Sequence, residues 1–172
     1  MIEDAHILAG SHIPLLTRIV DLSEGEILEV GTGYFSTSLL HWLAHVYKRT
    51  VYSYENNPNW YKKFLRSSSK YHKFFFVNNW DEIPLTPPSG KRWGVIFIDH
   101  SPTDRRIIEI EKFAKIADFI VIHDTETDKE KYYHYSKIWP LFKYIYHFNK
   151  IYPWTSVVSN FYNHKLLPES LK

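Results

Sequence analysis

Two pairs of aspartate and histidine stand where short apolar runs of the sequence end. Asp99-His100 follows the run GVIFI. His123-Asp124 follows the run DFIVI. Carboxylates in such places can bind a divalent cation or position a substrate hydroxyl, and an aspartate can orient a histidine as a general base. The chain has no cysteine, so a metal would have oxygen and imidazole ligands, which suit Mg, Mn or Zn. The structural alternative is that the aspartates cap loops and the histidines pack.

A turn with two glycines follows an earlier apolar run. Residues 29–36 read EVGTGYFS, in which Gly31 and Gly33 allow a tight turn and a close approach of the backbone to a ligand. The helix expected next offers free N–H groups to an anion. A dinucleotide-binding fingerprint needs a third glycine where this chain has Ser36. The pattern therefore favours a related nucleoside cofactor, with a plain strand–helix turn as the alternative.

Two further strand ends carry side chains that suit a nucleoside. Glu55 lies about 20 residues beyond the glycines, the spacing of an acid that binds ribose hydroxyls. Asn79 can pair with the edge of an adenine, and Trp80 can stack on its ring. The alternatives are a solvated carboxylate and an ordinary turn with a packed tryptophan. His12 precedes the first strand, where the chain can fold over the pocket.

These side chains need an alternating α/β framework to bring them together. Periodicity predicts helices over 13–22, 36–46, 58–69, 104–113 and 126–136, and strands over 26–30, 50–55, 74–78, 94–98, 118–122, 142–148 and 155–160. Ser36, Asn57 and Thr103 are the expected helix caps. Prolines between the third and fourth strands indicate a short or irregular connection there. We expect a Rossmann-like, doubly wound, mostly parallel seven-stranded sheet with a C-terminal antiparallel hairpin, and a site at the carboxyl ends of the strands.

Length and composition fit one soluble domain. The 172 residues divide into an N-terminal helical segment (1–25), a cofactor-binding core (26–126) and an aromatic-rich C-terminal part (127–172). The net charge of +2 indicates no nucleic-acid partner, and no apolar run is long enough to span a membrane. Without a signal peptide, the expected location is the cytoplasm. The pairs Lys62-Lys63 and Arg105-Arg106 are interpreted as solvated helix faces.

Aromatic residues are in excess, at 17% of the chain. Many of the 13 Tyr, 11 Phe and 6 Trp fall in the segment 132–162. Aromatic side chains are enriched at the core of protein interfaces. This segment is therefore the expected place for a homodimer or partner contact.

Taken together, these features resemble the class I S-adenosylmethionine-dependent methyltransferases. The segment 27–36 resembles the first motif of that superfamily. The two aspartate–histidine pairs resemble the fourth and fifth strand ends of a small branch, methyltransferase domain 24. The resemblance covers roughly 13–126, and more loosely the two terminal strands.

The resemblance implies a role for each strand-end residue. The amino-acid part of S-adenosylmethionine would lie at the glycine turn, the ribose and adenine farther along the sheet edge, and the transferred methyl beside the fourth strand. The residues implied for these contacts are Glu29, Gly31, Gly33 and Ser36 for the amino-acid part, Glu55 for the ribose, Asn79 and Trp80 for the adenine, and Asp99 for the methionine and methyl.

The implied reaction is methyl transfer to a hydroxyl of a small molecule or sugar, with His100 or His123 as the base. In catechol-type O-methyltransferases, a related branch, acids equivalent to Asp99 and Asp124 bind Mg together with an Asn, where this chain has Thr125. A divalent cation is the second cofactor that this resemblance raises, and Thr125 departs from the metal-binding pattern of that branch. Two alternatives stay open: an NAD-dependent oxidoreductase, and a non-catalytic Rossmann-like module for binding or assembly.

Overall fold

The computed structural model describes residues 9–163. Its α-helices and strands alternate through most of the chain, and short 3-10 turns fill the rest. The elements are α2 (Ile13–Leu22), β1 (Ile27–Val30), α3 (Ser36–Tyr47), β2 (Val51–Glu55), α4 (Pro58–Leu65), β3 (His72–Phe76), η1 (Trp80–Glu82), β4 (Trp93–Ile98), η2 (Thr103–Arg105), α5 (Arg106–Phe113), β5 (Ala117–His123), η3 (Thr127–Lys129), α6 (Glu130–Tyr133), η4 (Tyr135–Lys137), η5 (Trp139–Leu141), β6 (Tyr144–Phe148) and β7 (Thr155–Ser159).

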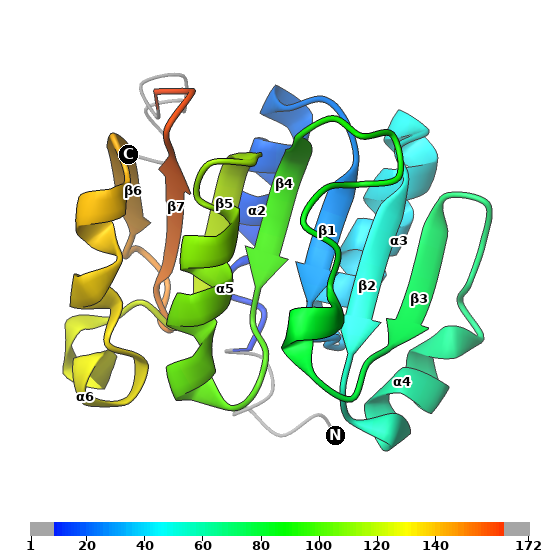
Figure 1. The fold of residues 1–172 in the computed structure, drawn as a ribbon, viewed down its shortest axis with the longest axis horizontal. Coiled ribbons are helices and arrows are strands. Elements are labelled where there is room, and N and C mark those ends of the chain that lie inside the picture. Colours follow the sequence, from blue (N-terminus) through cyan, green and yellow to red (C-terminus); the bar gives the residue numbers. More distant parts are fainter. Residues whose placement is uncertain (1–8, 164–172) are drawn as a thin grey trace.

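The strands form one seven-stranded sheet in the order β3-β2-β1-β4-β5-β7-β6 (Figure 1). Strands β1 to β5 are parallel, and β7 runs antiparallel to both β5 and β6. The predicted fold class is therefore confirmed, including the antiparallel C-terminal pair. The strand order reverses between β1 and β4, which is where open α/β sheets bind their ligands.

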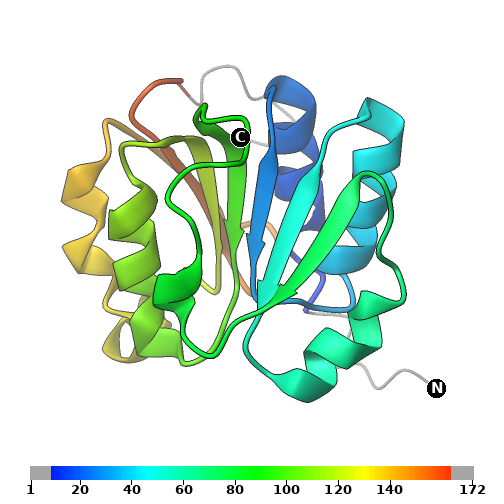
Figure 2. The same ribbon diagram turned by 45° about the vertical axis from the view of Figure 1, so that its right-hand side comes forward.

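Helices cover both faces of the sheet, as Figure 2 shows from the side. Successive residues of a strand point to opposite faces, and the buried side chains divide accordingly. Leu28 and Val30 of β1 pack on the same face as Phe113 of α5. Ile27 of β1 points to the other face of the sheet. There it packs in one cluster with Leu16 of α2 and with residues of α3. An apolar core on each face of the sheet thus fixes the positions of the strands and of their carboxyl ends.

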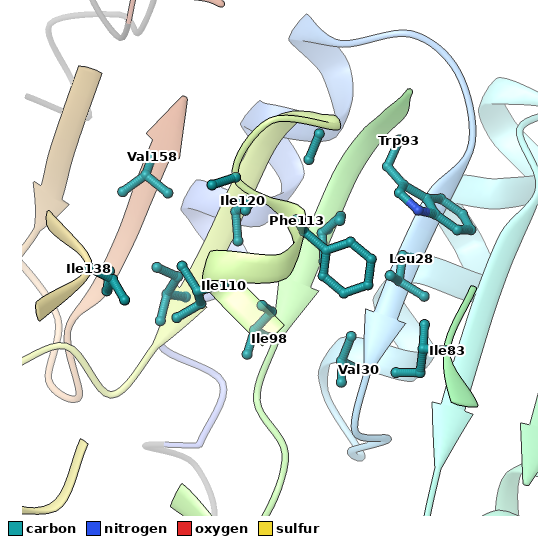
Figure 3. Packing of buried hydrophobic residues seen from close by; sticks show 14 of the residues in the cluster. Leu28, Val30, Ile83, Trp93, Ile98, Ile110, Phe113, Ile120, Ile138 and Val158 are labelled. Carbon is teal, nitrogen blue, oxygen red and sulfur yellow. The ribbon is translucent and has the colours of Figure 1, made fainter. Parts of the chain in front are cut away.

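The connection from β3 to β4 contains no α-helix, as the prolines predicted. Instead it crosses the α5 face of the sheet, with η1 as its only helical turn. It buries Trp80 and Ile83 in that core, and Figure 3 shows Ile83 there near Leu28 and Val30. The Trp93 indole donates to the Leu85 carbonyl oxygen (3.0 Å) and holds the later part of the connection. An extended segment therefore fills the space that a crossover helix normally covers.

Local competition for hydrogen bonds explains where elements differ from the prediction. Helix α4 ends at Leu65 rather than near residue 69, since the Ser69 hydroxyl accepts from the N–H groups of Tyr71 and His72. Strand β3 accordingly starts at His72, two residues early. The helix expected over 126–136 is broken into short turns, because His134 adopts a left-handed conformation (φ 56°) that ends α6.

Of the three predicted caps, only Asn57 is confirmed. Its side-chain oxygen accepts from the N–H groups of Asn59 and Trp60 at the start of α4. Ser36 lies inside α3, whose N-cap position is Phe35. Thr103 lies within η2 and makes no capping bond. Within residues 9–163, no helix has the length and apolar character needed to cross a membrane.

Candidate functional site

A cavity of about 280 Å³ opens at the carboxyl ends of β1 and β4, the place predicted from the strand order. Its wall comes from three parts of the chain: the segment before α2, the glycine turn with the start of α3, and single residues of α4 and the β4 end. The lining residues are Ala9, His12, Thr32, Gly33, Tyr34, Phe35, Ser36, Trp60 and Asp99. Three predicted site residues, Gly33, Ser36 and Asp99, are thus brought together.

Gly31 explains how the β1 and β4 ends approach so closely. Its φ of +87° is in the left-handed region, and a Cβ on it would lie 2.7 Å from the His100 Cα. Any other residue would clash with the backbone after β4. Gly33 differs, because a Cβ there would meet only the Ser36 hydroxyl at 3.3 Å. Gly31 therefore allows the close approach of the two strand ends. Gly33 lines the cavity without a side chain and so leaves space in it.

Glu29 supports the glycine turn from below and does not line the cavity. Its side chain is fully buried, with Oε1 accepting from the Thr37 hydroxyl (2.9 Å). The Thr37 oxygen in turn accepts from the N–H of Gly33 (2.9 Å). Burial raises the pKa of Glu29 to about 7. Glu29 thus reaches the glycine turn through Thr37 and does not line the cavity, and the cofactor contact predicted for it stays a prediction.

A line of hydrogen bonds leads from Glu29 toward the protein surface. The Ser53 hydroxyl donates to Glu29 Oε2 (2.5 Å) and lies 2.7 Å from Nε2 of His72. When Glu29 is ionised, the Ser53 proton points at it, and Nε2 of His72 then carries the proton that it shares with Ser53. Burial and the neighbouring histidines lower the pKa of His72 to about 3, so its Nδ1 is bare and accepts from Nδ1 of His41 (3.3 Å). Every donor in this line points toward the buried carboxyl.

Glu55 clamps the glycine turn by four hydrogen bonds. Oε2 accepts from the N–H and hydroxyl of Thr32 (2.8 and 2.7 Å), and Oε1 from the N–H groups of Asn56 and Asn57 (3.0 and 2.8 Å). These bonds occupy the lone pairs of the carboxylate, which is only 5% exposed. Ribose hydroxyls could therefore reach Glu55 only by replacing one or more of these four bonds.

The predicted adenine contacts lie elsewhere in this arrangement. Trp80 is buried in the core under the β3–β4 connection, where its indole N–H donates to the Ser101 carbonyl oxygen (2.9 Å). The Asn79 side-chain oxygen caps η1 by accepting from the N–H of Asp81 (3.1 Å). Neither residue lines the cavity. Trp80 is a core residue in this structure, and the adenine role predicted for it stays a prediction.

Arg106 joins the two strand-end acids. Its guanidinium donates to Asp99 Oδ1 (2.8 Å) and lies 3.2 Å from Asp124 Oδ2, and it also donates to the His100 carbonyl oxygen. The interpretation of Arg106 as a solvated residue is wrong, since it is 4% exposed. A cationic side chain thus lies where a metal bridging Asp99 and Asp124 would sit, and Thr125 turns away to Ser156 (2.7 Å). These two acids do not fit the predicted shared Mg site.

His123 carries a proton on each ring nitrogen. The single Ser11 proton goes to the carbonyl oxygen of Pro153 (2.6 Å), so the Ser11 oxygen accepts from His123 Nε2 (2.9 Å). Nδ1 faces Asp99 Oδ2 at 3.2 Å. Burial alone would raise the pKa of Asp99, but the charges of His123 and Arg106 hold it below its usual value. Asp99 is therefore an anion, and His123 donates to it as an imidazolium.

Electrostatics agree with this protonation of His123. Burial alone would lower its pKa, but the nearby Asp99 charge and hydrogen bond raise that pKa above its ordinary value. An imidazolium has no lone pair with which to accept a proton. The structure therefore does not support His123 as the general base.

His100 points away from the cavity. Its buried ring packs against Trp80, with centroids 4.5 Å apart, and its Nε2 lies 3.1 Å from Oε2 of the equally buried Glu109. The backbone, not the ring, of His100 faces the glycine turn. The prediction that His100 acts as a base does not fit this placement.

His12 is the imidazole that does reach the cavity. It is 1% exposed, and neither ring nitrogen has a hydrogen-bond partner within residues 9–163. Its ring lies edge-on to that of His123, with centroids 4.9 Å apart. Burial, and then the charge of His123, lower the pKa of His12 to about 3, so it is neutral. The site thus contains one charged and one neutral imidazole beside Asp99.

Sequence reasoning missed two positioning residues and gave little weight to a third. Arg106 stands in the first turn of the helix after β4, from which a long side chain can reach back to the strand ends. Thr37 lies one helical turn beyond Gly33, a spacing that allows its hydroxyl to reach the turn. For His12, the sequence offers only its place before β1 as a signal. The spacings of Arg106 and Thr37 can be read from the sequence, but interpreting them requires knowing where the helices begin.

Comparison with known proteins gives the fold. No family model matches the sequence, and no curated protein matches it. A proposed caffeoyl-CoA O-methyltransferase from Staphylococcus aureus is similar in structure (TM-score 0.61, 15% identity, 88% of this chain and 83% of that chain). So are the human methyltransferase 10 domain containing protein (0.65, 12%, 90% and 84%) and M. capricolum TrmK in complex with S-adenosyl-homocysteine (0.55, 15%, 87% and 69%). The chain has the fold of class I S-adenosylmethionine-dependent methyltransferases.

Proposed function

We propose that this protein is an S-adenosylmethionine-dependent methyltransferase that modifies a hydroxyl of a small molecule or sugar. The observation that supports it most is the cavity at the strand-order reversal, where the glycine turn, the start of α3 and Asp99 meet. The S-adenosyl-homocysteine seen in the similarly folded TrmK supports the same cofactor class. The Asp99-His100-Ser101-Pro102 sequence after β4 lacks an Asn-Pro-Pro-Tyr type motif for amide acceptors, which favours oxygen.

The donor set at the β1–β4 end suits the amino-acid part of the cofactor. Asp99 presents an anionic carboxylate that can accept from an ammonium group. Gly33 lines the same cavity without a side chain and leaves room for that group. When bound, S-adenosylmethionine supplies an electrophilic methyl group on a sulfonium. The chain itself aligns the acceptor and excludes water from a cavity walled by Phe35 and Trp60.

The ribose end requires a change at Glu55. Since Thr32 occupies one carboxylate oxygen, we expect ribose hydroxyls to take over the bonds that the Thr32 side chain now makes. The exchange conserves hydrogen bonds at Glu55, so it need not cost much free energy. The Asn56 and Asn57 bonds to the other oxygen can stay in place.

Calorimetric titration with S-adenosylhomocysteine and with NAD tests the cofactor class. We expect binding of S-adenosylhomocysteine and a loss of about tenfold or more in Gly33→Ala, whose new methyl group enters the cavity without backbone strain. Gly90→Ala is the control, because Gly90 has no atom within 4 Å of its added Cβ and does not line the cavity. Tighter NAD binding would support an oxidoreductase, and no nucleoside binding would support a non-catalytic module; either result overturns the proposal.

The acceptor class needs its own measurement. Transfer of a labelled methyl group to a panel of phenols, sugars and amines separates oxygen from nitrogen acceptors. We expect methyl ethers as products. Products methylated at nitrogen alone would contradict the acceptor part of the proposal and leave the cofactor part intact.

A further inference from the structure

His12 has a feature that the proposed function does not explain. An imidazole with no hydrogen-bond partner is costly to bury, and buried polar side chains nearly always have one. Both nitrogens of His12 lack a partner within the described residues, yet the ring is 1% exposed and borders the cavity. A ligand bound to one ring nitrogen would give that atom a partner.

Two further metal-binding groups lie beside it. One ligand atom each from His12, Asp99 and His123 lie within 4.8 Å of one another. Among residues 9–163, these three form the group of His, Cys, Asp or Glu side chains whose spacing could hold an ion. Metal–nitrogen and metal–oxygen bonds of about 2.1 Å place neighbouring ligand atoms about 3 Å apart, so small side-chain rotations would complete the site.

The outer contacts of a metal site are already present for two of the ligands. Ligand histidines almost always donate their second N–H to a polar partner, and Nε2 of His123 donates to Ser11. Ligand carboxylates are likewise held by hydrogen bonds, and Arg106 holds Oδ1 of Asp99. These contacts leave Nδ1 of His123 and Oδ2 of Asp99 on the side where the two residues face each other.

The charges in and around the group can accept a dication. An ion takes the place of the Nδ1 proton of His123, which leaves that ring neutral. Asp99 and Asp124 then provide two negative charges against the single positive charge of Arg106. Imidazole ligands favour first-row transition ions over Mg²⁺ or Ca²⁺, and two histidines with one carboxylate leave coordination positions free toward the cavity.

We propose that His12, Asp99 and His123 form a binding site for a divalent first-row transition-metal ion beside the cavity that His12 and Asp99 line. The site differs from the Asp99–Asp124 pair because it lies on the other oxygen of Asp99, away from Arg106. Its binding of a metal does not depend on the proposed methyl transfer. A bound ion could also lower the pKa of an acceptor hydroxyl and so activate it, and this second role rests on the proposed methyl transfer.

Titration of the tag-free full chain with Co²⁺, without any nucleoside, tests the site by calorimetry and visible absorption. We expect one equivalent to bind with nitrogen-ligand d–d bands, and excess Mg²⁺ to leave them unchanged. His12→Gln and Asp99→Asn should each lower the affinity by about tenfold or more. Ser11→Ala should lower it by roughly 10- to 100-fold, as expected for a residue that orients a ligand.

His45→Gln is the matched control, because His45 is exposed and belongs to a separate histidine cluster with His41 and His72. Its Co²⁺ affinity should equal that of the unchanged protein. Thermal melting of each variant confirms folding, and the unchanged protein alone can refute the site by failing to bind Co²⁺. Displacement by Mg²⁺, or loss of binding in His45→Gln but not in His12→Gln, would also overturn the proposal.

Discussion

Gly31 carries the tightest constraint at the scale of single residues. Its φ of +87° and the 2.7 Å between an added Cβ and the His100 Cα act together. We expect Gly31→Ala to lower the free energy of unfolding by at least about 2 kcal/mol in urea titrations. Gly90→Ala isolates the backbone contribution, because Gly90 has a similar φ of +73° and open space around it. Its loss should be about 1 kcal/mol, and equal losses would contradict the steric argument.

Glu29 should make stability depend on pH near neutrality. Its pKa is about 7 in the fold against an ordinary 4.5, so the folded state holds the proton more tightly than the unfolded chain. The stability this carboxyl contributes is fully present below about pH 4.5 and is lost as pH rises through about 7. The whole effect is roughly 3 kcal/mol, and Glu29→Gln should remove it.

Urea unfolding of Glu29→Gln and of the unchanged protein between pH 4.5 and 8 measures this effect as a difference. The difference should grow in favour of the variant as pH rises, because other titrating groups are common to both proteins. Glu24→Gln, which removes an exposed carboxylate, should show no such trend. A constant difference for Glu29→Gln would mean that the buried carboxyl is not protonated more easily in the fold.

The candidate site shows which facts about single residues a sequence contains. The positions of Asp99 and His123 after buried strands could be predicted, since apolar runs mark the strand ends. The directions in which the neighbouring side chains point could not be predicted. His100 follows Asp99 directly, yet it packs under Trp80, because backbone angles in the loop decide which side chain enters the cavity. Asp124, with φ 57°, is another example of a loop conformation that no periodicity predicts.

At the scale of elements, α4 positions Trp60 in the cavity wall. Asn57 satisfies two N–H groups at the start of this helix of 8 residues. We expect Asn57→Ala to reduce the free energy of unfolding by about 1 kcal/mol, and to weaken S-adenosylhomocysteine binding if α4 frays. Asn59→Ala, an exposed change in the same turn, should be neutral or slightly stabilising in the same denaturant titrations. Equal effects of the two changes would rule out the cap.

Strands were easier to predict than helix ends for a physical reason. Buried parallel strands such as β4 and β5 are continuous apolar runs, because both of their faces are covered. Helix ends depend instead on which group takes a free N–H or carbonyl. Ser69 limits α4 in this way, and the left-handed His134 divides the segment after β5. Such choices are made by local hydrogen bonds and backbone angles that leave no periodic pattern, so the sequence predicts the elements but not all of their limits.

The aromatic excess has a role at the scale of the whole molecule. In the C-terminal segment, Tyr133, Tyr135 and Phe142 are buried in the core that packs against α5 and β5. Other rings of this segment, including Tyr132 (52%) and Tyr152 (47%), are exposed. Much of the excess therefore stabilises the fold itself. A homodimer through the exposed rings stays a prediction, which sedimentation of the purified protein can test.

Arg106 connects the ends of two neighbouring strands, because it bonds to residues after β4 and after β5, and it lies over the ring of Tyr133 (4.9 Å). Replacing it with methionine leaves Asp99 and Asp124 near each other without their shared cation. Breaking a buried ion pair from one side is strongly destabilising, so Arg106→Met should lower the free energy of unfolding by about 3 to 5 kcal/mol.

Arg92→Met is the matched control for this change. Arg92 also pairs with an aspartate, Asp118 (2.8 Å), but its side chain is 46% exposed, so its loss should cost less than about 1 kcal/mol. Adding Asp124→Asn to Arg106→Met should recover part of the stability, since it removes one of the two stranded charges. Equilibrium unfolding of the three variants decides the matter. If Arg106→Met were no more destabilising than Arg92→Met, the strand ends would be held by the apolar cores alone, and the charged cluster would serve binding rather than folding.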